Sequence, residues 1–384
     1  MKKNFTLLLV LTSFLVLAQP PGYYTTATGT GYVLKTNLKN IIDNNTNSNG
    51  TADYGDLWIL YTNTAFRDNY YENNGSLLDI YSEKPAGPDS YEFTSASQQC
   101  GGSTPSTEGN CYNREHTMPQ SVFSSNYPMY SDAHFVLPTD NRVNGWRNNF
   151  PFGKVVTSTA IVANNTTVGN AANVPVFTTN QSRLGQNLNS GYSAGYSGVV
   201  FEPIDEFKGD IARAMLYFAT RYETQIPSWS YVMFDGSSTK VFSDTFLNIL
   251  ITWHNSDPVS PYEIAKNNAV YTFQGNRNPF IDNPGYVCQI WSATCNALST
   301  ESFAFENNLT IYPNPTSNNE VYVQTEIDLK SIFLYNVNGQ IVQEIKNPSR
   351  VENNTYKVVN LPKGFYFMQL ASENASTIKK LIVN

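Results

Sequence analysis

Residues 111–153 hold the side chains whose types and spacing could do chemistry. Two of the three histidines in the chain, His116 and His134, lie in this stretch. Glu115 directly precedes the first histidine, and Asp132 stands two residues before the second. Amides and arginines crowd the remainder: Asn141, Arg142, Asn144, Arg147, Asn148 and Asn149. A core segment would show apolar periodicity, whereas this stretch is mostly polar, so we predict a functional site here.

These residue types suit metal-assisted hydrolysis of a phosphodiester. A neutral imidazole can accept a proton from water near pH 7. Carboxylate and amide oxygens are hard ligands that favour Mg²⁺ or Ca²⁺ over Zn²⁺, and Mg²⁺ keeps positions for water and for phosphate oxygens. Guanidinium groups bind phosphate in a bidentate manner. A base, hard metal ligands and guanidinium groups in one stretch therefore indicate this reaction class.

The elements that position the groups can be inferred locally. In a strand Glu115 and His116 would point to opposite faces, so both can serve one site only at a strand end. Pro119 supports such an ending. We expect a strand end to supply the base and the carboxylate.

A helix should follow and face that strand end. Thr139 is the predicted N-cap, with Asp140 in the first helical turn. Asn144 and Arg147 are three residues apart and would lie on one face of this helix. The amide of Asn144 would then complete a compact metal site.

At this point the stretch resembles the bacterial endonuclease I family, secreted or periplasmic nucleases with a ββα-metal active site. The resemblance rests on five motifs that occur in the family's order and span the middle of the chain. They are Asn113-Arg114-Glu115-His116-x-x-Pro119-x-Ser121, Asp132-x-His134-x-x-x-Pro138, Val143-Asn144-x-x-Arg147-x-Asn149, Lys208-Gly209-Asp210-x-Ala212-Arg213-Ala214 and Gln274-Gly275-Asn276-Arg277-Asn278-Pro279-Phe280. One such motif would be weak, whereas five in order are specific.

The resemblance implies a role for each matching residue. His116 would be the general base, and Glu115 and Asn144 would hold one Mg²⁺, with Mn²⁺ or Ca²⁺ as substitutes. Arg147 would grip phosphate during catalysis, and the products would carry 5′-phosphate and 3′-hydroxyl ends. The remaining matches would contact substrate (Arg114, Arg277) or support the site (Asp132, His134, Asp210, Arg213).

The N-terminus reads as a targeting segment. Lys2 and Lys3 precede an apolar run, and Ala18 before Gln19 makes a sensible cleavage point. The run is too short to span a bilayer, so residues 1–18 are a predicted signal peptide. No later segment is apolar enough for a transmembrane helix, so we expect an exported, soluble protein.

The cysteines fit an oxidising compartment. Local pairing, Cys100 with Cys111 and Cys288 with Cys295, is the simplest of three connectivities. Zinc binding is the alternative, although the spacings lack a C-x₂-C pair. The first bridge would staple the loop that leads to the catalytic strand.

The chain has 384 residues, of which 41% are hydrophobic and 14% charged, enough for two domains. We predict an α+β fold: a mixed catalytic domain at residues 19–298, a linker at 299–307 and a small all-β sandwich at 308–384. Expected helices are Asn37–Asp43, one over Leu57–Ala65, Gly209–Glu223, Phe246–Trp253 and Tyr262–Val270. Expected strands before the tail are Leu77–Tyr81, Gly153–Val156 and Val199–Phe201.

Turn signals divide the tail into seven short predicted strands. They are Thr310–Tyr312, Glu320–Gln324, Ile332–Tyr335, Gln340–Glu344, Tyr356–Val359, Phe365–Leu370 and Ile378–Val383.

The tail resembles the C-terminal sorting domain of the type IX secretion system of Bacteroidetes. The resemblance is carried by Tyr312-Pro313-Asn314-Pro315, Asn338-Gly339, Leu361-Pro362-Lys363-Gly364-Phe365-Tyr366 and Lys379-Lys380-Leu381-Ile382-Val383. It implies recognition by that secretion machinery and passage across the outer membrane, often with removal of the tail. The protein would be secreted or held at the cell surface. A generic β-sandwich binding module is the alternative.

The charge balance argues against a strongly basic binding surface. The net charge is −7 and there is no run of Lys or Arg. The segment from Asn113 to Lys154 contains four basic and three acidic residues, which gives a local net charge of +1 before a cation is added. We therefore expect a monomer that binds DNA, with RNA as a second substrate, weakly, in a salt-sensitive way and without base readout.

Two other functions compete with a secreted nuclease. A secreted adhesin or binding module would suit the Tyr and Asn content, but would have no reason to carry Glu115-His116 with Asn144. A phosphodiesterase for small diesters would keep the chemistry and change the substrate. Loss of function on chelation separates the first from a nuclease, and competition between DNA and small esters separates the second.

Overall fold

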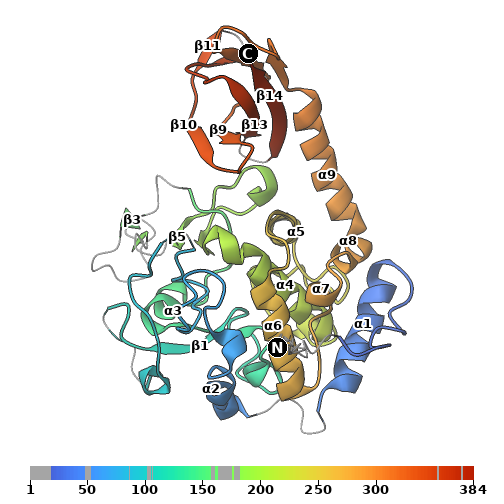
Figure 1. Ribbon diagram of the computed structural model, residues 1–384. Helices are drawn as coiled ribbons and strands as arrows, with labels where there is room; N and C mark the ends of the chain where they lie inside the picture. The colour runs from blue at the N-terminus through green and yellow to red at the C-terminus, as the bar shows by residue number, and fades with distance from the viewer. Residues whose placement is uncertain are drawn as a thin grey trace, which may run out of the picture.

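The computed structural model describes residues 19–47, 53–85, 87–101, 105, 107–156, 161–162, 175–176, 182–352, 354–372 and 375–384. The predicted signal peptide lies outside these residues. The fold is α+β: a mixed helical and β region is followed by an all-β region (Figure 1). The predicted fold class is confirmed. No helix among the described residues has the length and apolar character needed to cross a membrane.

The helices surround one large core. They are α1 Gly31–Asn45, α2 Leu57–Leu60, α3 Asn141–Arg147, α4 Lys208–Arg221, α5 Asp244–Ser256, α6 Pro261–Gln274, α7 Pro279–Asp282, α8 Tyr286–Ile290 and α9 Ser292–Asn307. Four of the five predicted helices are confirmed; three of them extend beyond the predicted bounds at both ends, and α4 ends two residues earlier than expected. The central one, α4, is buried along its whole length, because α1, α5 and α7 pack around it. An amphipathic pattern at this position predicts only one buried face, so its full burial is a tertiary effect.

The local sequence explains where α6 starts and stops. Ser260 accepts a hydrogen bond from the Glu263 amide, the Glu263 carboxylate caps the Ser260 amide in return, and Pro261 occupies the first turn. Gly275 ends the helix at φ 87°, a left-handed conformation that glycine adopts without steric cost.

Three predictions in the catalytic region are wrong in their detail. Helix α2 stops at Leu60, and short 3-10 turns flank it instead of a helix running to Ala65. Residues Leu77–Tyr81 form no strand: Leu77 makes an isolated bridge with Arg67, and a turn follows in which the Asp79 carboxylate accepts the Tyr81 amide and the Asp79 carbonyl accepts the Ser82 amide. Residues 153–156 make only an isolated bridge, at Val155.

The strands of the catalytic region are β1 Tyr112–His116, β2 Val136–Asp140, β3 Ile161–Val162, β4 Pro175–Val176, β5 Arg183–Gln186 and β6 Val199–Glu202. Strands β1 and β2 form an antiparallel pair in which Glu115 lies opposite Leu137 and His116 opposite Val136. Strands β3 to β6 form a separate four-stranded sheet.

Helix α3 begins directly after β2, which makes a ββα unit. Its N-cap is Asp140, whose Oδ1 accepts hydrogen bonds from the amides of Arg142 and Val143. Thr139, the predicted N-cap, remains in β2 and donates its hydroxyl proton to Asp79 instead. The correction moves the cap by one residue and keeps Asn144 on the helix.

The tail is a two-sheet β region with its own core. Its strands are β7 Thr310–Tyr312, β8 Val321–Gln324, β9 Ser331–Asn336, β10 Ile341–Lys346, β11 Arg350–Glu352, β12 Thr355–Val358, β13 Gly364–Ala371 and β14 Ser376–Val383. One sheet has the order β10-β9-β13-β14 and the other β11-β12-β8-β7. Alternate apolar residues of both sheets, such as Val321, Val323, Met368 and Leu370, face the shared core.

The seven predicted tail strands are all present, and β11 is an addition. Helix α9 covers residues 299–307, which the sequence indicated as a linker, and leads into the β region (Figure 1). A disulfide between Cys288 and Cys295 joins α8 to the first turn of α9. The segment predicted to link the two regions therefore lies within a continuous helix.

Candidate active site

A polar cleft of about 240 Å³ opens at the end of the ββα unit. It is lined by Tyr54, Asn113, Arg114, Glu115, His116, Pro119, Gln120, Asn141, Asn144, Gly145, Arg147, Asn148 and Asn149. All of these except Tyr54 belong to β1, to the loop after it, or to α3 and the residues that follow. The fold thus brings together five of the residues that sequence motifs singled out: Arg114, Glu115, His116, Asn144 and Arg147.

Glu115 is held in a fixed orientation through one of its two carboxylate oxygens. Its Oε1 accepts a hydrogen bond from the Tyr81 hydroxyl at 2.8 Å and lies 3.1 Å from a guanidinium nitrogen of Arg147. Burial raises the pKa of Glu115 to about 7, although Arg147 and Tyr81 favour the ionised form. Both contacts use Oε1, so Oε2 is left for a cation, whose charge would favour the carboxylate further.

His116 is buried and held as a neutral base. Its Nε2 lies 3.0 Å from the carbonyl oxygen of Tyr130. A carbonyl oxygen only accepts, so Nε2 carries the proton and Nδ1 of the neutral ring keeps the free electron pair. Burial, with smaller contributions from the nearby Arg114 and Arg147, lowers the pKa of His116 to about 4, although the hydrogen bond to the Tyr130 backbone opposes the shift. The imidazole is therefore unprotonated at pH 7 and can accept a proton at Nδ1.

Aromatic rings fix the plane of this imidazole. The ring of Tyr130 stacks on it at 5.4 Å between centroids, and that of Tyr54 at 5.7 Å. The two tyrosine rings also stack on each other at 3.9 Å. Neither tyrosine belongs to a motif that sequence reasoning identified, and with 25 tyrosines in the chain no local signal distinguishes them.

Arg114 presents a guanidinium group to the cleft. Its guanidinium carbon lies 3.5 Å from the ring centroid of Tyr54 and 4.2 Å from that of Trp58. One guanidinium nitrogen donates a hydrogen bond to the Tyr54 carbonyl. It forms no ion pair with any acid in the described part of the chain, so its charge is available to an anion. This placement agrees with the expected contact to substrate.

Arg147 lines the cleft but is almost fully buried. Its side chain is only 1% exposed, and its guanidinium donates to the carbonyls of His116 and Thr117 while it pairs with Glu115. The resemblance implied that Arg147 grips phosphate. That contact stays a prediction; in the structure the side chain is held by the end of β1 and by Glu115, which would let it position both groups.

Asn144 projects from α3 on the side of the cleft. Its side-chain amide makes no hydrogen bond that would tie it to the rest of the described chain, and it is half-buried. An amide oxygen here and the free oxygen of Glu115 are two hard ligands in the same cleft. The site can therefore hold a hard divalent cation while leaving positions for water and phosphate.

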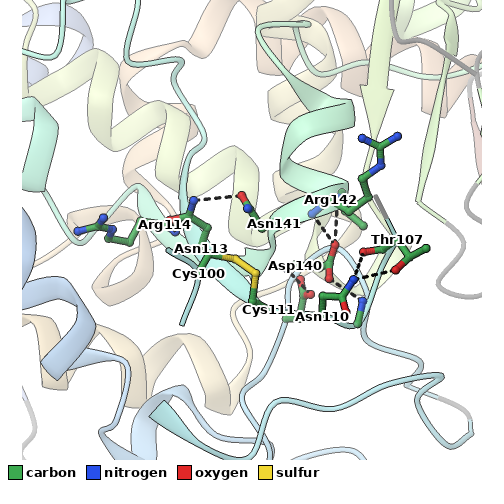
Figure 2. The surroundings of a disulfide bond; sticks show 12 residues. Cys100, Thr107, Asn110, Cys111, Asn113, Arg114, Asp140, Asn141 and Arg142 are labelled. Atoms are coloured by element: carbon green, nitrogen blue, oxygen red, sulfur yellow. Dashed lines mark hydrogen bonds between the residues drawn. A yellow bond between two sulfur atoms is a disulfide. The ribbon is translucent and has the colours of Figure 1, made fainter. Parts of the chain in front are cut away.

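Further contacts hold the ββα unit together at the start of β1 and of α3. The disulfide between Cys100 and Cys111 closes a loop immediately before β1 (Figure 2). The backbone amide of Asn141 donates a hydrogen bond to the Cys111 carbonyl. Figure 2 also shows the Asn113 side chain bonded to Asn141 of α3. The predicted pairing is therefore present, and it fixes the start of the strand against the start of the helix.

Asp132 and His134 lie away from the cleft in a buried polar cluster. Asp132 accepts hydrogen bonds from the side chains of Arg221, Tyr222 and Gln274. His134 Nε2 contacts the backbone and side-chain oxygens of Asn276. These contacts tie the segment before β2 to the C-terminal end of α4 and to the end of α6, and the supporting role stays a prediction.

Asp210, Arg213 and Arg277 are also buried and outside the cleft. Arg213 forms a two-pronged pair with Glu263, at 2.7 and 2.6 Å, and Asp210 lies within 3.8 Å of Arg213. Arg277 forms the same kind of pair with Asp282, at 2.7 and 2.8 Å. Arg277 is only 2% exposed and does not line the cleft, so its expected contact with substrate stays a prediction that this placement does not favour.

Comparison with known proteins supports a nuclease. Residues 30–285 match the family model of endonuclease I, and residues 310–384 match the secretion system C-terminal sorting domain. A protein of Bacillus amyloliquefaciens named extracellular ribonuclease is 28% identical over 275 residues, covering 70% of this chain and 78% of that protein. Its counterpart in Bacillus subtilis (strain 168), with the same name, is 29% identical over 277 residues, covering 70% and 78%.

Proposed function

We propose a mechanism for this chain from the premise that it belongs to the endonuclease I family and is therefore a nuclease, a hydrolase of phosphodiester bonds. In this proposal His116 activates water, Glu115 and Asn144 hold one Mg²⁺, and Arg114 binds phosphate. The observation that carries it is the neutral, carbonyl-anchored imidazole of His116 beside the Glu115 carboxylate in one polar cleft.

The donor set fits a hard divalent cation. One carboxylate oxygen of Glu115 and the amide oxygen of Asn144 would be the two protein ligands, a number typical of Mg²⁺ sites that also take water and phosphate. Mn²⁺ and Ca²⁺ also accept oxygen ligands and are proposed substitutes. When bound, the ion would neutralise charge on the scissile phosphate and supply a water that protonates the leaving oxygen.

His116 moves the proton of the attacking water. Nδ1 takes that proton while the water oxygen forms a bond to phosphorus, and the bond from phosphorus to the 3′ oxygen breaks. The products carry 5′-phosphate and 3′-hydroxyl ends. The Nε2 hydrogen bond to Tyr130 holds the reactive nitrogen toward the cleft and can strengthen as the ring becomes positive.

The substrate we propose is nucleic acid, both DNA and RNA, read through its backbone. Both Bacillus relatives are named ribonucleases, which supports RNA beside DNA. The net charge of −7 limits long-range attraction, so Arg114 and a bound cation would supply most of the local positive charge. We infer weak, salt-sensitive binding without base recognition by a monomer.

Export follows from the tail. Residues 310–384 match a sorting domain of a secretion system, so the protein is directed out of the cell. We propose that residues 1–18 are removed as a signal peptide and that the type IX machinery recognises the β region. The enzyme would then act on nucleic acid outside the cell or at its surface.

Cleavage of plasmid DNA and of a structured RNA by the mature protein tests the mechanism. Mg²⁺ should support cleavage of both and EDTA should stop it. His116→Ala should slow cleavage by roughly 10²–10⁴-fold, the contribution of a general base. His254→Ala is the matched control: it deletes an imidazole that is also buried, 7% exposed, and outside the cleft, and should keep its activity.

The result that would overturn the mechanism is equally definite. If folded His116→Ala cleaves at the rate of the His254→Ala protein, His116 is not the base. If neither DNA nor RNA is cut with Mg²⁺, Mn²⁺ or Ca²⁺ while a small phosphodiester is hydrolysed, the nucleic-acid substrate is wrong and the chemistry stands.

A further inference from the structure

A second group of carboxylates lies outside the cleft, in the segment that precedes β1. Asp68, Glu72 and Glu83 each offer a carboxylate oxygen, and these three oxygens lie within 4.8 Å of one another. Asp68 and Glu83 are buried, at 0% and 1% exposure, and Glu72 is half-buried. None of the three lines the catalytic cleft.

The carboxylate of Glu83 has no hydrogen-bond partner. Both of its oxygens are buried and unsatisfied, and so is Oε2 of Glu72. No Lys or Arg in the described part of the chain forms an ion pair with any of the three acids. The neighbouring Lys84 turns away and donates to Ser90. Buried carboxylates without partners are costly, so this arrangement calls for a ligand that supplies positive charge.

Asp68 shows that the segment is built around this point. Its Oδ1 accepts hydrogen bonds from the amides of Tyr70 and Tyr71, and its Oδ2 accepts from the amide of Asn73. The turn that carries Glu72 is thus wrapped around the Asp68 carboxylate.

We propose that Asp68, Glu72 and Glu83 bind a structural Ca²⁺ ion, separate from the catalytic metal. Ca²⁺ takes six to eight oxygen ligands in flexible geometry, and several carboxylates are its usual partners. Mg²⁺ demands a tighter octahedron and keeps most of its water, so a site with three converging protein carboxylates favours the larger ion. An exported protein meets Ca²⁺ at the concentrations that extracellular sites use.

The site has a structural task that its contacts define. Glu83 donates its amide proton to the Asp79 carbonyl, and Asp79 in turn accepts the Asp140 amide at the start of α3. Tyr81, between the two acids in sequence, donates its hydroxyl proton to the catalytic Glu115. A cation at Glu83 would therefore fix the turn that orients the carboxylate of the active site.

Calcium binding is best measured where the catalytic site cannot contribute. The mature Glu115→Gln protein, stripped with EGTA, is titrated with CaCl₂ by calorimetry in the presence of excess Mg²⁺. One Ca²⁺ should bind for each chain, and the melting temperature should rise by several degrees, roughly the shift that saturating a single site produces. This measurement detects Ca²⁺ binding and needs no catalytic activity. The Ca²⁺ proposal can therefore fail or succeed independently of the proposed nuclease mechanism.

Glu83→Gln in the same background should lose both the binding heat and the rise in melting temperature. In EGTA this variant should melt close to the temperature of its parent, because the amide nearly matches the carboxyl group in size and adds no buried charge. That comparison shows that the variant folds. Glu344→Gln, which neutralises a more exposed acid of the β region, is the matched control and should keep Ca²⁺ binding.

Three outcomes would overturn the proposal. The parent protein could show no binding heat and no thermal shift with Ca²⁺. The Glu83→Gln variant could bind Ca²⁺ as its parent does. Mg²⁺ alone could stabilise the parent as much as Ca²⁺ through the same three residues, which would make the ion assignment wrong.

Discussion

Arg147 lies 3.1 Å from Oε1 of Glu115 and donates, from the same guanidinium nitrogen, to the carbonyl of His116 at 2.8 Å. One buried cation thus fixes both the proposed metal ligand and the backbone of the proposed base. The pair spans α3 and β1, so it also holds the ββα unit together.

Replacing Arg147 should therefore lower kcat and stability and leave substrate affinity nearly unchanged. Arg147→Ala leaves the Glu115 carboxylate buried without its partner, and breaking a buried pair in this way costs about 3–5 kcal/mol. Measurement of kcat and KM at a temperature where the variant is folded is the test. A selective rise of KM that grows with salt would instead show that Arg147 contacts phosphate.

Arg114 should show the opposite pattern. Its guanidinium faces the cleft without an ion-pair partner among the described acids, so Arg114→Ala should raise KM more than it lowers kcat. The slope of log affinity against log salt should fall by about 1, because one phosphate contact is lost. Arg114→Lys keeps the charge and should keep the slope, which makes it the matched control. An unchanged slope in Arg114→Ala would contradict the assignment.

Removal of the Tyr81 hydroxyl should lower the affinity of the proposed site for Mg²⁺, because this hydroxyl orients Glu115. Tyr81→Phe deletes the 2.8 Å hydrogen bond to Glu115 Oε1 without opening a cavity. Contacts of this kind to metal ligands contribute about 10–100-fold in metal affinity or activity, so the Mg²⁺ concentration for half-maximal cleavage should rise within that range.

Tyr61→Phe is the control for Tyr81→Phe. It also deletes a buried hydroxyl, one that donates to the Val136 carbonyl of β2 at 2.9 Å. This variant should need no more Mg²⁺ than wild type. Equal Mg²⁺ dependence in both variants would show that Tyr81 supports the fold and not the metal ligand.

The grouping of the central site residues in one cleft could be predicted because they are close in sequence. Glu115, His116 and Asn144 fall within one strand pair and the helix that follows, so their types and spacing already specify a local unit. The contacts of Tyr54 and Tyr81 could not be inferred in this way. Tyr81 stands 34 residues before Glu115 and belongs to no periodic pattern, so only the tertiary fold reveals it.

Burial decides which arginines can meet substrate, and a motif does not report burial. Arg114, Arg147 and Arg277 all lie in family-like motifs, yet only the first faces the cleft without a carboxylate partner. Arg147 and Arg277 are each paired with an acid and almost fully enclosed. The apolar run Leu77–Tyr81 favoured a strand, but the Asp79 carboxylate accepts the Tyr81 amide and stabilises a turn instead. A local apolar pattern does not reveal such a side-chain contact.

The tail strands were predictable since alternation of apolar residues is a local property. All seven predicted strands exist with boundaries shifted by at most two residues at either end. Strand β11 has only three residues, partly or largely exposed, so it carries no alternating pattern to detect. The predicted linker lies within helix α9, whose helical form no local signal indicated and which packs against α5 and β14.

Asp132 should make folding sensitive to acid. Burial alone would raise the pKa of this carboxyl, but Arg221, Gln274 and Tyr222 together hold it below its ordinary value of 3.8. A depressed pKa in the folded state contributes stability that is present above the unfolded value and is lost as pH falls through the folded one. Asp132→Asn, which leaves Arg221 without its closest partner, should therefore lower the free energy of unfolding by about 3–5 kcal/mol at pH 7.

The difference between wild type and Asp132→Asn should stay constant above about pH 5 and shrink as pH falls below 3.8. Urea denaturation at a series of pH values measures it. Asp43→Asn removes the other acid near Arg221, at 3.6 Å, and that acid is 41% exposed. It should cost about 1 kcal/mol or less, as exposed pairs do. Equal losses in the two variants, or a difference independent of pH down to pH 2, would show that the buried charge of Asp132 does not stabilise the fold.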